Sequence, residues 1–570
     1  RLFNCAQPPF RSLFQGDRGI ALQQYWINLL KYNMNKMSRS FSGRFKYKMY
    51  EAQNILRIGR LTRAVAKKAK VNKEQKPVIF FNASARIIST SLNAAFSSLT
   101  AWGLRLTGVP VKHFVCNAGM SRCVLETRYD EPSYEPACHL CTAQSQRLTA
   151  GASVEWFDYQ ENNSLKKKII GLTVEELSEV VFQDIPLGKL VLPSFRWALR
   201  RQYLPEDDAT QFLLTQFILS AYNVANKFKK LLDENPPAVV VVFNGQMFPE
   251  AVARFIAQKQ DIPVVTHEVS FQPLSGFFTY GEATAFPIEI PEDFELNEIQ
   301  NLELDEYLGK RFQGSFTMAG IQFWPEMKSL SQELVNKIEK FEQVVPIFTN
   351  VVFDTSQPHA NMVFENMFTW LDSILEKIKV HPETLFVIRA HPDEHREGKA
   401  SVDSVQKWLL KNQVDQLPNV VFIDSNDFIS SYDLIARAKF VIVYNSSIAL
   451  EATLMGAAVL CGGKSRFTAY DTMFFPATVP EYQEKIEEFL NTENVDVPDK
   501  FIMNARRFLY FQNWQVSLPF DDFIEEHALN GYVKFKNFNP ETLHPNQSKT
   551  IQKIVDGLFE DKSFTKKVAK

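Results

Sequence analysis

The sequence lacks any apolar run long enough to cross a lipid bilayer. A membrane-spanning helix needs about 18 or more consecutive, predominantly apolar residues. The most apolar run here, Ala238 to Phe243, has the length of a single strand. We therefore expect a protein that does not span a membrane.

The signature motifs of several common enzyme classes are also lacking. No GxGxxG, HExxH or GxSxG pattern occurs in a convincing context, which disfavours dehydrogenases, zinc metallopeptidases and serine hydrolases. The run 462–465 (GGKS) resembles the end of a P-loop, but that motif requires glycine where this chain has Ala458, and no predicted helix follows closely. We therefore reject a P-loop and expect Gly462 and Gly463 to let the backbone approach a ligand, with Lys464 or Arg466 on phosphate.

A strong overall charge is absent, because the net charge is −2, but the charges are unevenly distributed. Residues 1–76 carry 17 Lys and Arg against 3 Asp and Glu, which leaves 46 against 62 for the remainder. Two interpretations remain open for this basic arm. It binds an anionic membrane surface or another polyanionic partner, or it is a helical extension that docks on the acidic body.

Strand-like and helix-like patterns alternate along most of the chain. The composition, with 45% hydrophobic and 22% charged residues, is globular, and 570 residues exceed what one core usually supports. Regular alternation of strands and helices predicts parallel, doubly wound sheets. The predicted fold class is α/β, with two tandem Rossmann-like domains, a helical N-terminal extension and C-terminal helices.

The composition shifts divide the chain into four predicted parts. They are a basic helical extension (1–76), an N-terminal Rossmann-like domain (77–335) with a Cys-rich insertion (116–141), a C-terminal Rossmann-like domain (336–500), and a C-terminal helical segment that packs back on the body (501–570).

Cysteine is scarce, but four of the six cysteines fall within 26 residues, at Cys116, Cys123, Cys138 and Cys141. The last two form a CxxC pair, a spacing that structural zinc sites use, whereas the six residues between the first two exceed the usual two to four. Three interpretations stay open: a structural zinc or other metal site, a disulfide or redox pair, and unlinked thiols.

Polar residues follow the predicted strands of the first domain. Asn244 follows strand 238–243, and His267 and Glu268 follow strand 262–265. Ligands of open α/β sheets bind at the carboxyl ends of the strands. We therefore expect these three side chains to face one cleft.

The second domain repeats this arrangement with residues suited to anions. The strand 344–353 leads into a loop with Asn350, Asp354 and Thr355. Strand 385–389 ends at Arg389 and is followed by His391, and both side chains can donate hydrogen bonds to an anionic oxygen.

A serine pair, Ser446 and Ser447, precedes a short predicted helix that carries Glu451. Hydroxyls and unpaired N–H groups at a helix start can hold phosphate, and a carboxylate further along can bind a ribose diol. The alternatives are an ordinary N-cap for the serines and a solvated or capping carboxylate for Glu451.

These residues carry a family resemblance. The two α/β halves, the RxHP turn at 389–392 and the serine pair followed by Glu451 resemble the GT-B glycosyltransferases, and more narrowly the bacterial capsule and surface-polysaccharide biosynthesis proteins. The HP and serine motifs are similar to those of transferases that use CMP-activated sugars. The resemblance implies that His391 contacts the donor phosphate, that Ser446 and Ser447 contact the phosphate or nucleotide, and that Glu451 binds the ribose.

We therefore expect a glycosyltransferase that extends a bacterial surface glycan from a nucleotide sugar. The alternatives are a non-hydrolysing sugar-nucleotide epimerase and a non-catalytic polysaccharide-assembly protein. The expected site comprises donor-binding residues (Asn350, Thr355, Arg389, His391, Ser446, Ser447, Glu451 and Lys464), acceptor-binding residues (Asn244 and Phe271), and a catalytic base (His267 or Glu268, with Asp354 second).

The resemblance also implies partners and location. The donor is expected to be a CMP-, UDP- or GDP-linked sugar and the acceptor a glycan or lipid-linked glycan, with no nucleic-acid partner. GT-B enzymes generally need no bound metal for catalysis, so the only metal expected is the structural zinc described above. We expect a cytoplasmic location, with peripheral association at the inner face of the membrane through the basic arm as a further option.

Overall fold

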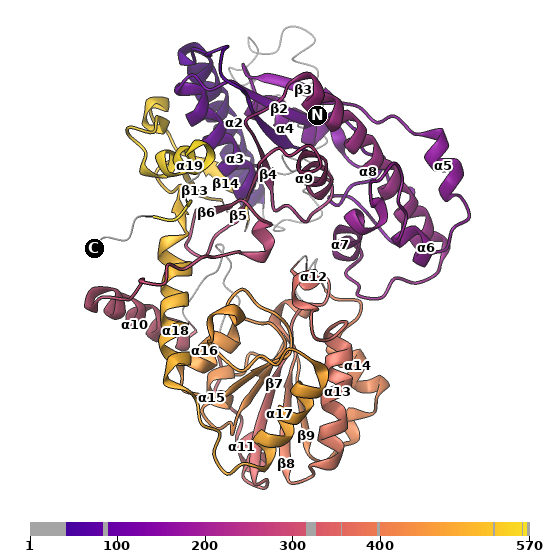
Figure 1. Cartoon of the computed structure of the whole chain (residues 1–570), viewed down its shortest axis with the longest axis vertical. Coiled ribbons are helices and arrows are strands. Elements are labelled where there is room, and N and C mark those ends of the chain that lie inside the picture. The colour runs from indigo at the N-terminus through magenta and orange to yellow at the C-terminus, as the bar shows by residue number, and fades with distance from the viewer. Residues whose placement is uncertain are drawn as a thin grey trace, which may run out of the picture.

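A computed structural model of the chain describes residues 41–83, 89–314, 327–354, 356–395, 400–527, 531–560 and 563–566, without the side chains of 41–48 and 50. Two α/β units lie one above the other (Figure 1). None of the described helices combines the length and the apolarity that crossing a bilayer requires.

The first unit is built on a seven-stranded sheet with the order β12-β6-β5-β4-β1-β2-β3. Its strands are β1 (Val78–Asn82), β2 (Val111–Cys116), β3 (Ser153–Phe157), β4 (Val239–Phe243), β5 (Val264–Val269), β6 (Ser275–Thr279) and β12 (Leu518–Pro519). Strands β1 to β5 pair in parallel. Strand β6 pairs antiparallel with β5, and β12 pairs antiparallel with β6. The four consecutive valines of β4 occupy the middle of the sheet, where both faces are covered.

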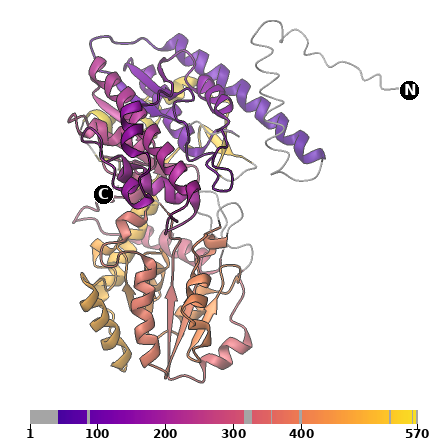
Figure 2. The ribbon, with the colours of Figure 1, turned by 90° about the vertical axis from the view of Figure 1, so that its right-hand side faces the viewer.

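Helices cover both faces of this sheet. They are α3 (Leu92–Leu106), α4 (Cys138–Leu148), α5 (Asn163–Ile169), α6 (Val174–Ser178), α7 (Leu187–Leu199), α8 (Asp208–Glu234) and α9 (Glu250–Gln258). The long helix α8 begins where the Asp207 side chain accepts a hydrogen bond from Thr210 N at 2.8 Å. Helix α2 (Phe41–Lys68) packs against α4, and its first turns project beyond the body (Figure 2).

The second unit has a five-stranded, all-parallel sheet with the order β11-β10-β7-β8-β9. Its strands are β7 (Gln343–Phe348), β8 (Thr384–Arg389), β9 (Val420–Ile423), β10 (Val441–Val443) and β11 (Val459–Cys461). Its helices are α11 (Gln332–Ile338), α12 (Gln357–Ala360), α13 (Met367–Val380), α14 (Val405–Lys411), α15 (Ser431–Ile435), α16 (Ile448–Leu454) and α17 (Val479–Asn491).

The last part of the chain ties the two units together. Helix α18 (Asp499–Tyr510) runs along both units in Figure 1, beside α10 (Glu298–Phe312). After it, β12 joins the first sheet, and a hairpin of β13 (Ile524–Glu526) and β14 (Val533–Phe535) precedes α19 (Lys549–Phe559). The close approach of α19 to α3 requires a glycine, because a Cβ on Gly103 would lie 2.7 Å from Ile551 Cγ2.

The predicted fold of two tandem Rossmann-like units, a GT-B-like arrangement, is confirmed, with differences at the edges. The segment 501–570, expected to be helical, also contributes three short strands. Of these, β12 pairs with the distant β6, and β13 and β14 pair with each other in a hairpin. Strand β3 was not predicted, because it is a half-exposed edge strand in which only Phe157 is buried. Strand β6 reverses direction after β5 and was likewise not predicted.

Candidate functional site

A cavity of about 820 Å³ lies between the two units, at the carboxyl ends of their parallel strands. Loops that follow β5, β7, β8, β10 and β11 supply much of its lining. The expected site residues that line it are Asn244, Glu268, Phe271, Asn350, Asp354, Arg389, His391, Ser446, Ser447, Glu451 and Lys464. Thr355 lies outside the described residues.

His267 does not face this cavity, and the expectation that it shares a cleft with Glu268 is wrong. The two residues are neighbours on β5, and successive strand side chains point to opposite faces. His267 is buried, with Nδ1 3.3 Å from Asn93 Oδ1, and burial lowers its pKa to about 3. It is therefore a neutral histidine of the first unit, outside the cavity between the units.

Glu268 is held rigidly at the edge of the first unit. Its Oε1 accepts hydrogen bonds from Asn93 Nδ2 and Val269 N, both at 2.8 Å. Its Oε2 accepts one from Asn244 Nδ2, also at 2.8 Å. Asn244 thus positions a carboxylate, in addition to lining the cavity as predicted.

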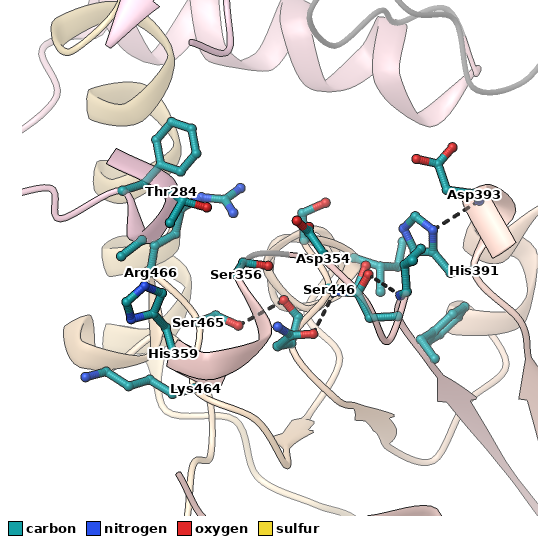
Figure 3. Close-up of a pocket in the computed structure, with 18 of the residues that line it drawn as sticks. Thr284, Asp354, Ser356, His359, His391, Asp393, Ser446, Lys464, Ser465 and Arg466 are labelled. Carbon is teal, nitrogen blue, oxygen red and sulfur yellow. Dashed lines mark hydrogen bonds between the residues drawn. The ribbon is translucent and has the colours of Figure 1, made fainter. Parts of the chain in front are cut away.

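His391 follows β8 at the start of the short 3-10 turn Pro392–His395. Its Nδ1 accepts a hydrogen bond from Asp393 N at 3.2 Å, so the neutral ring carries its proton on Nε2. Burial lowers the pKa of His391 below its ordinary 6.5, although the carboxylates of Asp393 and Asp354 act in the opposite direction. Figure 3 shows His391 beside Asp393, well separated from Lys464 and Arg466. His391 is therefore placed as a neutral N–H donor.

Glu394, in the same turn, is fully buried. Its Oε1 accepts a hydrogen bond from Val405 N at 2.9 Å, while Oε2 has no hydrogen-bond partner among the described residues. Burial raises the pKa of Glu394 from 4.5 to about 8. The folded chain therefore retains a proton that the unfolded chain releases above about pH 4.5.

Glu394→Gln is expected to remove a pH dependence of stability. In the native protein, the contribution of this proton is complete below about pH 4.5 and is lost as the pH rises to about 8. The uncharged amide avoids this loss, so the variant should equal the native protein near pH 5 and exceed its unfolding free energy at pH 9 by on the order of 3 kcal/mol. Urea unfolding at both pH values measures the difference. The exposed Glu376→Gln is the control, and an equal effect of Glu394→Gln at both pH values would contradict the prediction.

Arg389 is buried at the end of β8 and donates from Nη2 to Asp427 O at 3.3 Å. Burial lowers its pKa to about 10, so the guanidinium stays charged at neutral pH. The site therefore has a desolvated cation two residues before His391.

Asn350 and the serine pair sit where the ends of β7 and β10 meet. Asn350 Nδ2 donates to Asn445 Oδ1 at 2.6 Å, and Ser465 Oγ donates to Asn445 O at 3.0 Å. Ser447 precedes α16 without a side-chain capping bond, so the ordinary N-cap role does not account for its hydroxyl. Asn350 thus joins two strand ends at the cavity.

Glu451 is engaged by protein groups that the sequence did not suggest. Its Oε1 accepts from Arg311 Nη2 at 2.6 Å, and its Oε2 accepts from the Tyr432 hydroxyl at 2.5 Å. Burial alone would lower the pKa of Arg311, but the adjacent carboxylate raises it above its ordinary value. A ribose would therefore have to share this carboxylate with Arg311 and Tyr432. Arg311 lies 140 residues before Glu451 in the chain, and no sequence signal linked the two.

Arg466 and Lys464 follow β11 at the same cavity, where Lys464 is exposed. Arg466 Nε donates to Gln512 Oε1, and its guanidinium lies 4.8 Å from the centre of the Phe271 ring. Burial lowers the pKa of Arg466 to about 10, and the neighbouring Arg311 acts in the same direction. Phe271 therefore packs against a cation, in addition to lining the cavity.

The two glycines at 462 and 463 have a packing role. A Cβ on Gly462 would lie 2.2 Å from Trp370 Nε1, and one on Gly463 would lie 3.1 Å from Tyr444 O. Glycine is therefore required here by the protein's own residues. The expected close approach of this backbone to a ligand is not the reason for it.

A contact between His359 and Glu282 bridges the two units at the cavity. His359 Nε2, on α12, lies 2.8 Å from Glu282 Oε2 of the first unit, and Glu282 also pairs with Arg254. Burial would raise the pKa of Glu282, but these two partners hold it below its ordinary value. Neither His359 nor Glu282 stood out in the sequence.

The four clustered cysteines line a second cavity of about 80 Å³, together with His267. None of the four forms a disulfide in the described structure, and burial raises the pKa of Cys123 to about 12, so this thiol is protonated at neutral pH. Within the described ranges, no group of three or more His, Cys, Asp or Glu side chains is placed to hold a metal ion. The four thiols thus share a cavity, and metal analysis of the purified protein tests whether they bind zinc.

Fold and cavity together define a two-unit α/β protein with a polar, cation-lined cleft. No protein-family model matches the sequence, and the search of curated proteins gives no match. A β-Kdo 2,4-transferase, KpsC of Thermosulfurimonas dismutans, is similar in structure with a TM-score of 0.33 and 10% identity, over 52% of this chain and 84% of that chain.

Two further solved structures are similar at the same level. The UDP-GlcNAc 2-epimerase of Neisseria meningitidis has a TM-score of 0.23 and 13% identity, over 76% of this chain and 98% of that chain. The sucrose-phosphate synthase of Thermosynechococcus elongatus has a TM-score of 0.27 and 10% identity, over 77% and 96%. These scores are too low to support an argument about function, so the function is argued from the cavity itself.

Proposed function

We propose that this protein is a glycosyltransferase that moves a sugar from a nucleotide-sugar donor to a glycan acceptor in the cavity between its two units. The observation that carries the proposal is the distribution of chemistry across this cavity. The second unit contributes the cations and N–H donors of Arg389, His391 and Lys464 beside the carboxylates of Asp354, Asp393 and Glu451. The first unit contributes the clamped carboxylate of Glu268.

The second unit is assigned to the donor. A departing nucleotide carries negative charge on its phosphate, and preorganised donors in a water-poor site stabilise such charge strongly. The Nε2–H of His391 and the guanidinium of Arg389 would supply this stabilisation, with Ser446 and Ser447 at the nucleotide. In this proposal side chains neutralise the leaving group, so no metal ion is required.

The first unit is assigned to the acceptor. An inverting transfer requires a base that takes the proton of the attacking hydroxyl. Glu268 would take it, because it is a carboxylate fixed by three hydrogen bonds at the cavity wall. Asp354, which also lines the cavity but belongs to the second unit, is the alternative base.

Nucleotide binding provides the most direct test. A thermal-shift panel with CMP, UDP, GDP and CDP is expected to show stabilisation by one of them. At about 100 times its dissociation constant, a ligand adds about 2.7 kcal/mol, which corresponds to a shift of about 2 °C for a chain of this length. Inorganic phosphate is the control for unspecific anion binding.

The outcomes separate the alternatives. No stabilisation by any nucleotide would contradict the proposal and favour a non-catalytic assembly protein. Conversion of a nucleotide sugar to its epimer without an acceptor would instead identify an epimerase, whereas a transferase would release the sugar only by slow hydrolysis.

A further inference from the structure

Helix α2 has one face that is committed to the body of the protein. Asn54 Oδ1 accepts from Phe535 N at 2.9 Å, Arg57 Nη1 donates to Phe535 O at 2.8 Å, and buried Glu51 lies 3.1 Å from His527 Nε2. Ile58, Leu61 and Val65, on the same side, are buried in the core. The interpretation of α2 as an extension that docks on the body therefore holds for this face.

The opposite face of α2 forms a continuous outward stripe. Its members recur at intervals of three or four residues, which places them on one side of a helix. The stripe comprises Met49, Gln53, Leu56, Arg60, Arg63 and Lys67, all exposed. Leu56 is 71% exposed and Met49 43% exposed. An apolar patch thus adjoins a basic patch on a helix that projects beyond the body (Figure 2).

Charge distribution indicates which partner this stripe fits. Residues 1–76 carry 17 basic against 3 acidic residues, whereas the remainder carries 46 against 62. An anionic surface attracts the first and repels the second, so it would orient the molecule with α2 toward the surface. Two exposed apolar side chains are too few for a stable protein interface of about 1,000 Å² or more. They are, however, sufficient to enter the headgroup region beside a basic cluster.

We propose that the outward stripe of α2 docks this protein on an anionic lipid surface. Arg63 and Lys67 contact the lipid phosphates, and Arg60, which also donates from Nη2 to Asn537 Oδ1, adds its charge beside them. Leu56 and Met49 enter the boundary between headgroups and acyl chains. The docking is peripheral, since α2 stays anchored to the body through Glu51 and Asn54. It does not depend on the proposed glycosyl transfer, because it can be measured without turnover.

Vesicle sedimentation with the full chain tests the proposal. Vesicles of phosphatidylcholine with about one third phosphatidylglycerol are compared with phosphatidylcholine alone, at about 0.1 M and about 0.5 M salt. The stripe variant combines Leu56→Gln, Arg60→Gln, Arg63→Gln and Lys67→Gln. The control variant combines Leu410→Gln, Lys166→Gln, Lys167→Gln and Lys168→Gln. It changes the same net charge and one leucine of similar exposure (57%) elsewhere on the surface.

The native protein and the control variant are expected to bind the anionic vesicles, and the stripe variant at least about tenfold more weakly. High salt should weaken the native binding because exposed charges are screened. Equal binding of the stripe variant and the native protein would overturn the proposal. Three further results would also overturn it. The native protein could bind both kinds of vesicle equally, it could bind only a soluble polyanion such as heparin, or it could self-associate in a way that the stripe variant abolishes. Matching thermal unfolding of all three proteins verifies that the variants are folded.

Discussion

Glu268→Gln is expected to lower kcat for glycosyl transfer by about 10²- to 10⁴-fold, the usual contribution of a general base. The amide cannot accept the proton of the acceptor hydroxyl. Donor binding should be unchanged, because Glu268 belongs to the first unit and the donor residues belong to the second. Steady-state kinetics with saturating donor and acceptor measure the loss, and a thermal shift with the nucleotide measures binding.

The matched control for Glu268→Gln is Asp354→Asn, since both carboxylates line the cavity from different units. A catalytic role of Glu268 requires that the acidic limb of the pH–rate profile disappears in Glu268→Gln and persists in Asp354→Asn. The introduced NH2 group would also face the amide donor of Asn93 or Asn244, so one of these hydrogen bonds is lost. Unfolding of the variant is therefore monitored separately. Unchanged transfer in Glu268→Gln would exclude this residue as the base.

His391→Ala is expected to lower kcat/KM for the donor by about 10²- to 10³-fold, the typical loss when one preorganised donor of this kind is removed. The substitution removes the Nε2–H that the hydrogen bond from Asp393 N orients. Nucleotide affinity should fall as well, because the same group contacts the phosphate before the transfer. Kinetics and the nucleotide thermal shift provide the two measurements.

The control for His391→Ala is His395→Ala, which removes a histidine from the same turn. The His395 Nδ1 lies 2.5 Å from Ser425 Oγ, and the residue does not line the cavity. Because burial lowers the pKa of His391, its ring becomes protonated at a lower pH than that of a histidine in water. A rise in donor affinity with its midpoint at or above pH 6.5 is therefore not expected. Equal losses in the two variants, or a rise in affinity through pH 6.5 that disappears in His391→Ala, would contradict this assignment.

The sequence was sufficient for features that depend on local pattern. The valine run of β4 and the regular alternation of strands and helices predict two parallel sheets. Such strands bury both faces only when helices cover the two sides of a parallel sheet. In a parallel sheet the carboxyl ends of the strands meet at one edge. Residues in the loops that follow the strands, such as Asn244, Asp354 and His391, were therefore correctly expected at one cavity.

Features that depend on the exact side-chain direction or on distant segments were decided only by the tertiary structure. His267 and Glu268 are adjacent, yet the register of β5 sends one into the first unit and the other into the cavity. Glu451 meets Arg311 across 140 residues, and β12 joins a sheet whose next strand, β6, lies more than 200 residues earlier. Contacts between residues so far apart in the chain produce no periodic pattern in the sequence, because they form only when whole helices and strands pack together. The residue types and their order therefore determined the fold and the location of the cleft, while packing determined which carboxylate faces it.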